Sequence, residues 1–341
     1  MASVDAVLAQ GPPAHSLAAG LSALRSSVLH SGVPSTSDGT SDSRIYIWLT
    51  LLNATPLRTD AYLDLVRQGA SPAYAKIRND TFRTLTTDPL YRRKVTENSL
   101  TRVLNAIAWK LHDANEARVN GWMSPPTLGV PRSLADAGEW HSPASGGTSR
   151  HTRGSVTGTE GSEAGDAGAG GGVGYVQGMN VMAAPFMYVA KSEAEAFAGF
   201  EKFITVECPA YVRGSMEGVH KGLALVDRLL ELLDPQLSAH LLSKGMKAEI
   251  YGFASVLTMC ACTPPLPEVL LLWDFLFAYG SHLNLLCIVA QLVMVRDQLL
   301  SSASPKPNFT PLRAKKVIEY TVDFARRVPV DLYREMLAHA K

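Results

Sequence analysis

The sequence predicts an all-α fold, and three observations support this prediction. Apolar residues recur at the three- and four-residue spacing of helices along most of the chain. Helix-cap residues and prolines stand where several of these patterns begin or end. No segment sustains the two-residue alternation of a half-buried strand. With 341 residues, of which 46% are hydrophobic and 18% charged, the chain can bury a sizeable core.

The first predicted helices lie in the N-terminal third. One has an apolar stripe that stops before Gly32, formed by Leu17, Leu21, Leu24 and Val28. A short helix is expected to begin at Ser71 and Pro72, by an N-cap and a proline at the first helical position. Ile77 and Phe82 are expected to anchor this short helix in the core.

Further helices follow the same pattern. A wide apolar stripe predicts the next clear helix, formed by Leu100, Val103, Leu104, Ile107, Ala108 and Leu111. Ser192 and Glu195 form a capping box that opens another helix. The stripe of Val219, Leu223, Val226, Leu230 and Leu233 ends where Asp234 and Pro235 start a new element. Thr310 and Pro311 predict the N-terminus of a C-terminal helix.

One stretch departs from the helical pattern. Residues 120–174 are rich in Gly, Ser, Thr, Ala and Pro and hold too little apolar surface to offset the entropy of ordering them. We therefore expect a disordered loop insertion within one domain. The chain would then divide into a flexible N-terminus (1–14), two parts of that domain (15–119 and 175–341) and the insertion. The glycine run is not a nucleotide loop, because no Gly-Lys dipeptide exists and the spacing misses G-x-G-x-x-G.

Charge and cysteine content narrow the function classes. A net charge of +1 predicts no bulk attraction to nucleic acid or to an anionic membrane. The cysteines, Cys208, Cys260, Cys262 and Cys287, lack C-x-x-C spacing and mostly occupy apolar runs, which favours buried thiols in the cytosol over a metal site or disulfides. The most apolar run, residues 283–295, is shorter than the about 20 residues of a membrane span, so no membrane insertion is expected.

Arg83 is the first candidate for a catalytic residue. A lone arginine after a helix is usually an ordinary surface residue, but this one follows Asp80 by three positions. That carboxylate is close enough to orient the guanidinium by a bidentate contact. Thr84 and a polar turn come next, so Arg83 should project from the edge of a loop. Its planar, permanently charged fork suits a phosphate group.

Gln177 is the second candidate. It lies between Tyr175 and Gly178, where the low-complexity stretch gives way to an apolar helix that starts near Asn180. By itself, a glutamine at a helix start most often hydrogen-bonds its own backbone. A large aromatic anchor on one side and a permissive glycine on the other would hold its side chain in one place at the surface.

Arg44 and Trp48 lie one helical turn apart on the same face. A structural role is expected for both. Trp48 is expected to pack in the core, and Arg44 to hold a neighbouring carboxylate or carbonyl by hydrogen bonds. The apolar helix end around Trp273 and Asp274 is assigned to packing.

These segments together resemble a known family. Arg44 to Trp48, Ile77 to Arg83 and Tyr175 to Gly178 match, in order, the R-x-x-x-W, I-x-x-D-x-x-R and Y-x-Q-G signatures of the TBC (RabGAP) domain. The runs KIRNDTFRT, YVQGMNVMAAPFMY, AEIYGFASVLT and LWDFLFAYGSHLN resemble its fungal mitotic-exit subgroup, which contains the yeast checkpoint GTPase-activating proteins of the spindle pole body.

The resemblance implies a function. The chain would accelerate GTP hydrolysis by a Ras-superfamily small GTPase, with Arg83 and Gln177 as arginine and glutamine fingers supplied in trans. Asp80 would support the arginine. The other supporting residues would be Thr84, Tyr175, Gly178, Asn180, Arg44 and Trp48. The chain would have no catalytic activity or cofactor of its own, because the GTPase brings GTP and Mg²⁺. A scaffold partner, completing a two-component activator, and a cytoplasmic location at the spindle pole body are also implied.

The sequence departs from the family pattern at two places, and two alternative functions compete with the one that the resemblance implies. The 120–174 insertion must loop out, because the finger motifs on either side have to converge, and Tyr251 stands where the family favours tryptophan. One alternative is a catalytically silent scaffold of the same fold, which would have no need of both Arg83 and Gln177. The other is an α-solenoid adaptor, disfavoured because no repeat of 30–50 residues recurs.

Overall fold

A computed structural model describes residues 3–12, 16–119 and 174–341. The regular elements of these residues are all helical, which confirms the all-α prediction. The chain divides into one large unit, residues 1–112 with 173–341, and a small unit, residues 113–172. Of the small unit only residues 113–119 are described, so the predicted insertion at 120–174 lies almost wholly outside the described residues.

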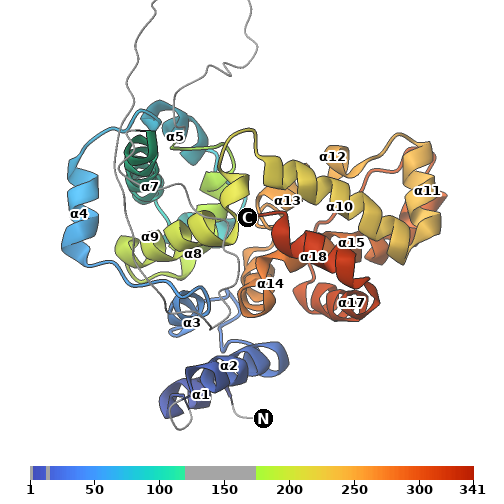
Figure 1. Cartoon of the computed structure of the whole chain (residues 1–341), viewed down its shortest axis with the longest axis horizontal. Helices are drawn as coiled ribbons and strands as arrows, with labels where there is room; N and C mark the ends of the chain where they lie inside the picture. Colours follow the sequence, from blue (N-terminus) through green and yellow to red (C-terminus); the bar gives the residue numbers. More distant parts are fainter. Residues whose placement is uncertain (1–2, 13–15, 120–173) are drawn as a thin grey trace, which may run out of the picture. The chain divides into compact units, whose positions relative to one another are not determined.

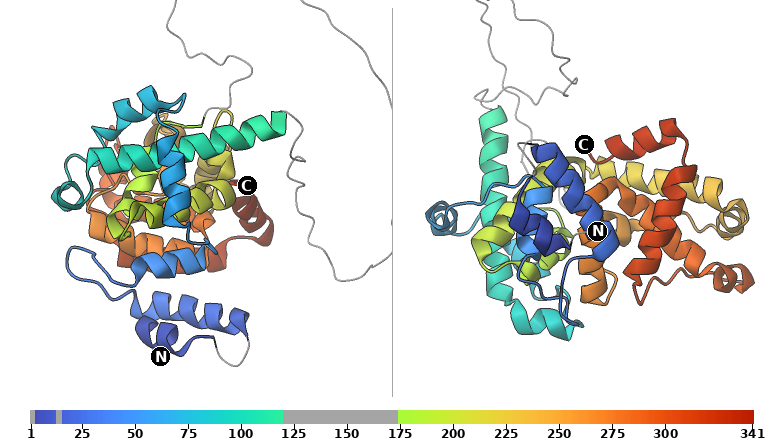
Figure 2. Two further views of the ribbon diagram at one scale, coloured as in Figure 1. Left: turned by 90° about the vertical axis from the view of Figure 1, so that its left-hand side faces the viewer. Right: turned by 90° about the horizontal axis from the view of Figure 1, so that it is seen from below.

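The described residues up to 119 form seven helices. They are α1 (Val4–Gln10), α2 (Leu17–Ser31), α3 (Arg44–Leu51), α4 (Thr59–Arg67), α5 (Tyr74–Thr81), α6 (Pro89–Lys94) and α7 (Glu97–Val119). Helix α1 falls within the stretch expected to be flexible, yet it packs against α2 and buries Val4 completely. The long α7 is the green helix in the left-hand view of Figure 2.

The second half of the domain begins with a helical hairpin, α8 (Met179–Val189) and α9 (Glu193–Lys202). A π-helical turn, η2 (Phe203–Glu207), and a 3-10 turn, η3 (Pro209–Tyr211), lead into the last group (Figure 1). That group comprises α10 (Glu217–Leu233), α11 (Pro235–Ser243), α12 (Ala248–Tyr251), α13 (Phe253–Leu257), α14 (Leu266–Tyr279), η4 (Ser281–Leu283), α15 (Asn284–Met294), α16 (Arg296–Ser301), α17 (Ala314–Arg327) and α18 (Val330–Ala338). Across the described ranges, no helix combines the length and apolarity needed to cross a membrane.

An aromatic cluster joins three of these helices at the centre of the core. Trp48 of α3 meets Phe186 of α8 edge-on at 5.4 Å between ring centroids, and Phe277 of α14 at 5.0 Å. Trp273 of α14 packs on both Trp48 and Phe203. Aromatic pairs of this kind add about 0.5–1.5 kcal/mol each beyond the burial of their area. The cluster therefore fixes α3, α8 and α14 against one another.

A buried ion pair lies beside this cluster. The Arg44 Nε donates to both oxygens of Asp274, at 3.0 and 3.2 Å, and Nη2 donates to Oδ2 at 3.1 Å. The Trp48 indole N–H donates to the same carboxylate at 2.7 Å, and the Arg44 Nη1 donates to the carbonyl of Gly39. Burial raises the pKa of Asp274, while the Arg44 guanidinium opposes that shift. Arg44 thus braces a carboxylate and a carbonyl within the core.

Two helix starts differ from the prediction. Helix α5 starts at Tyr74 rather than at Ser71, whose backbone N–H instead donates to the Asn105 side chain of α7 at 2.9 Å. Helix α17 starts at Ala314 rather than after Thr310, because the Glu268 carboxylate of α14 accepts the Ala314 N–H at 2.6 Å. Partners distant in sequence decide both boundaries.

The buried pair is expected to contribute strongly to stability. Arg44→Ala should lower the free energy of unfolding by about 3–5 kcal/mol, because it leaves the Asp274 carboxylate buried without its cation. Chemical denaturation followed by circular dichroism measures the change. Arg67→Ala is the control: Arg67 pairs with Asp64 at 2.7 Å, but the side chains are 70% and 69% exposed. That loss should stay below about 1 kcal/mol. Equal losses for the two variants would contradict the role given to the buried pair.

Candidate functional site

Arg83 projects from the turn that follows α5. Its side chain is 53% exposed, whereas that of Asp80 is only 7% exposed. The Arg83 Nη2 donates to Oδ1 of Asp80. This is a single contact and not the expected bidentate one, and the second oxygen of Asp80 accepts from another donor. Among the described residues, the other N–H groups of the guanidinium make no hydrogen bond.

That other donor is Tyr175. Its hydroxyl donates to Oδ2 of Asp80 at 2.9 Å, across 95 positions of sequence. Burial raises the pKa of Tyr175, and the bond to Asp80 raises it further, so the hydroxyl keeps its proton and remains a donor. One carboxylate thus joins the segment that carries Arg83 to the segment that carries Gln177.

Asn180 and Thr84 strengthen this connection. The Asn180 side-chain amide donates to the Thr84 hydroxyl at 2.9 Å, and that hydroxyl donates to the Asp80 carbonyl at 3.0 Å. The Asn180 amide oxygen accepts the Gly178 N–H at 3.2 Å. Asp80, Thr84, Tyr175, Gly178 and Asn180 therefore form one buried hydrogen-bond network, which we call the Asp80 network.

Gln177 lies on the turn that opens α8, with its side chain exposed between the buried residues Tyr175 and Gly178. Within the described part of the chain its side chain makes no hydrogen bond, so it does not cap its own helix. Gly178 has φ +104°, which side chains rarely adopt, and an added Cβ would lie 2.7 Å from Cδ2 of Leu257. Glycine lets the turn sit tightly against α13 while Gln177 faces outward.

Phe82 is where the sequence prediction fails most clearly. Ile77 is fully buried as expected, but Phe82 is 62% exposed and does not anchor α5. The residue directly before Arg83 therefore presents an aromatic ring to solvent.

Arg44 and Trp48 are not part of the Asp80 network, since their polar groups converge on Asp274 of α14. The sequence analysis assigned Asp274 to packing and missed its role as the carboxylate that binds Arg44 and Trp48. A lone acid within the apolar run of α14 was the available signal, because a carboxylate is rarely buried without a partner.

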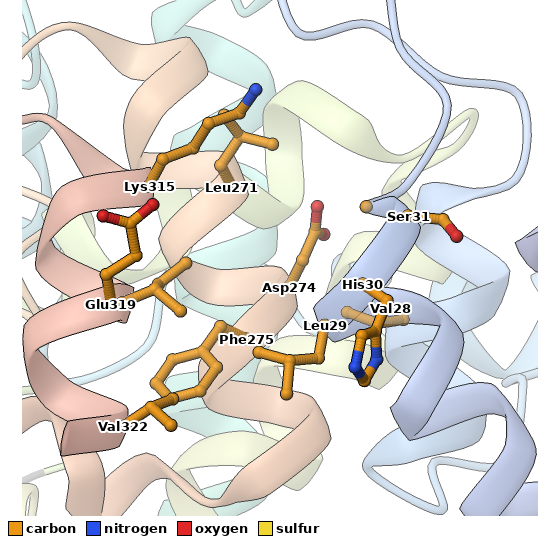
Figure 3. A pocket seen from close by; sticks show the side chains of 12 residues that line it. Val28, Leu29, His30, Ser31, Leu271, Asp274, Phe275, Lys315, Glu319 and Val322 are labelled. Carbon is orange, nitrogen blue, oxygen red and sulfur yellow. The ribbon is translucent and has the colours of Figure 1, made fainter. Parts of the chain in front are cut away.

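A cavity of about 570 Å³ lies elsewhere, among α2, α14 and α17. Figure 3 shows Lys315 and Glu319 of α17 on one side, Leu29 of α2 on the other, and Phe275 of α14 between them. None of the residues that line it comes from the Asp80 network. Arg83 and Gln177, by contrast, are both exposed at the surface.

Comparison with known proteins identifies relatives along nearly the whole chain. Residues 171–300 match the family described as RabGAP-TBC, Rab-GTPase-TBC domain. Cell division control protein 16 of Schizosaccharomyces pombe is 38% identical over 323 residues, which are 94% of this chain and 88% of that protein. Mitotic check point protein BUB2 of Saccharomyces cerevisiae is 32% identical, over 99% of this chain and 97% of that protein. A putative mitotic check point protein BUB2 of Dictyostelium discoideum is 30% identical, over 93% and 74%.

Solved structures agree on the fold. The Ypt/Rab-GAP domain of Gyp1p aligns with a TM-score of 0.61 at 15% identity, covering 90% of this chain and 92% of that one. A flagellar RabGAP TBC domain from Chlamydomonas aligns with a TM-score of 0.57 at 16% identity, covering 98% and 87%.

The contact between Gly178 and Leu257 predicts a specific stability loss. Gly178→Ala should lower the free energy of unfolding by about 2–4 kcal/mol, combining backbone strain with overpacking against Leu257. Gly245→Ala is the control, because Gly245 also has a positive φ, +71°, but an added Cβ there meets nothing within 4 Å. It should cost only the backbone strain, about 1–2 kcal/mol. Thermal and urea unfolding measure both, and a Gly178→Ala loss no larger than the control's would show that the turn is not closely packed.

Proposed function

Because this chain belongs to the Rab-GTPase-TBC domain family, we propose that it is a GTPase-activating protein for a Ras-superfamily small GTPase. The observation that carries the proposal is the Asp80 network, which holds two segments together so that Arg83 and Gln177 both project from it. The chain performs no chemistry on a substrate of its own. The GTPase brings GTP and Mg²⁺, and this chain completes its active site.

Arg83 would act on the transferred phosphoryl group. Negative charge builds up there in the transition state, and a guanidinium that enters the site neutralises it. Such a finger is worth up to roughly 10⁵ in rate, or about 7 kcal/mol of barrier. The single contact with Asp80 supports this role, because it orients the guanidinium and leaves donors free for the phosphate.

Gln177 would orient the attacking water through its amide, as glutamines of small GTPases do for themselves. Its exposure and its lack of a hydrogen bond within the described residues leave the amide available. Tyr175 and Gly178 on either side are fixed by Asp80 and Leu257, so the turn carrying Gln177 is held in place. Positioning of this kind reduces the entropy lost in reaching the transition state.

The cellular setting is also a proposal. The names of the relatives, a cell division control protein and two mitotic check point proteins, support action in mitotic-exit or septation signalling. The resemblance to the mitotic-exit subgroup adds a scaffold partner, with which the chain would form a two-component activator, and a cytoplasmic location at the spindle pole body. Affinity purification and imaging of a tagged chain through mitosis test these points, and a chain that stays dispersed and unpartnered would contradict them.

A panel of purified small GTPases, each assayed for single-turnover GTP hydrolysis with and without the chain, tests the central proposal. For the GTPase that responds, Arg83→Ala should lower the stimulated rate by on the order of 10²-fold or more without unfolding the protein. Arg83→Lys should fail nearly as badly, because an ammonium cannot reproduce the planar fork.

Arg228→Ala is the matched control for Arg83. The Arg228 side chain is 51% exposed and paired with a carboxylate, that of Glu335, but it lies on α10 and away from the Asp80 network. Its stimulated rate should equal that of the wild type. Near-normal stimulation by Arg83→Ala would refute the finger assignment.

A further inference from the structure

The packing of the fold does not explain the exposed position of the Phe82 side chain. Its ring is 62% exposed at the end of α5, whereas Thr81 and Thr84 on either side of the Phe82–Arg83 pair are 4% exposed. Among the described residues, it takes part in no aromatic pairing and does not pack on the core. An exposed large apolar side chain gains nothing from the fold, and it can contribute free energy when a partner removes it from water.

The backbone that carries Phe82 is held firmly. The Thr101 hydroxyl of α7 donates to the Thr81 hydroxyl at 3.1 Å. Thr84 is bonded to the Asp80 carbonyl and to Asn180. The exposed side chains of two consecutive residues, Phe82 and Arg83, therefore extend from a turn that is fixed at both ends. A contact made from such a turn loses little conformational entropy on binding.

We propose that Phe82 is a binding anchor that packs on an apolar patch of the small GTPase beside its nucleotide pocket. The inference rests on the proposed function, because Arg83 determines where Phe82 must go. Consecutive Cα atoms are only about 3.8 Å apart, so a finger that reaches the phosphates brings the preceding ring to the rim of the same pocket. Phe82 would then help to decide which GTPase is bound, and a GTPase with charged side chains at that rim would be disfavoured.

The anchor and the finger should have separable effects. Arg83 meets negative charge that builds up in the transition state, so its loss lowers the maximal rate. Phe82 meets a surface that stays the same from the bound complex to the transition state, so its loss weakens binding and leaves the maximal rate unchanged.

The test uses the GTPase that the wild-type chain of 341 residues stimulates most strongly in the panel. Single-turnover hydrolysis is measured against increasing concentrations of the chain. Phe82→Ala should raise the half-saturating concentration by about tenfold or more, as expected for a central aromatic anchor, and leave the maximal rate within about twofold. Phe82→Leu should recover most of the affinity, because the patch recognises apolar surface.

Leu242→Ala is the control, because Leu242 is also an exposed apolar residue, 46% exposed, but on α11, which packs against α10 and α16. It should leave both parameters unchanged. If Phe82→Ala leaves the half-saturating concentration unchanged, the inference about Phe82 is overturned while the proposed function stands. A lowered maximal rate with unchanged half-saturation overturns it as well, and would make Phe82 a positioning residue for Arg83. If the wild type stimulates no GTPase, the proposed function itself fails and the inference falls with it.

Discussion

The carboxylate of Asp80 is the interaction on which the candidate site depends. One oxygen receives the Arg83 guanidinium and the other receives the Tyr175 hydroxyl, so a single side chain relates two segments separated by 95 positions. Neither contact would suffice alone. Without Tyr175, Asn180 would be the remaining member of the Asp80 network that joins the Gln177 segment to the Arg83 segment, and without the guanidinium, the buried carboxylate would lack a cation. The arrangement gives two exposed side chains a shared and rigid base.

The rigidity of this base comes from the core behind it. The first turn of helix α8 contains Asn180 of the Asp80 network, and the helix continues to Phe186 in the aromatic cluster with Trp48 and Phe277. Trp48 shares the Asp274 carboxylate with Arg44. The helix that presents Gln177 is therefore fixed at its start by hydrogen bonds and farther along by ring packing. Catalytic groups that act by position need this kind of support, since small displacements cost large factors in rate.

Helical periodicity was sufficient to predict the fold class, and short motifs were sufficient to select the residues of the Asp80 network. The prediction that Phe82 and Ile77 both anchor α5 in the core was wrong. Phe82 lies five positions after Ile77, which is about 140° around a helix of 3.6 residues per turn, so the two side chains cannot share a face. The apolar surroundings of Asp274 indicate that it needs a partner, but they could not identify Arg44, which is 230 positions away. The start of α17 was missed for the same reason, since Glu268 of α14 provides its cap.

The central claim is that Arg83 and Gln177 stabilise the transition state of GTP hydrolysis on a partner. The most direct measurement is the affinity of the wild type, Arg83→Ala and Gln177→Ala for the responding GTPase, first with GDP and then with GDP and aluminium fluoride, which mimics the planar phosphoryl group. The wild type should bind the second form at least about 100-fold more tightly, as transition-state analogues are bound. Each substitution should remove most of that preference and change the affinity for the GDP form far less. A preference that survives both substitutions, or an equal loss in both nucleotide states, would contradict the account.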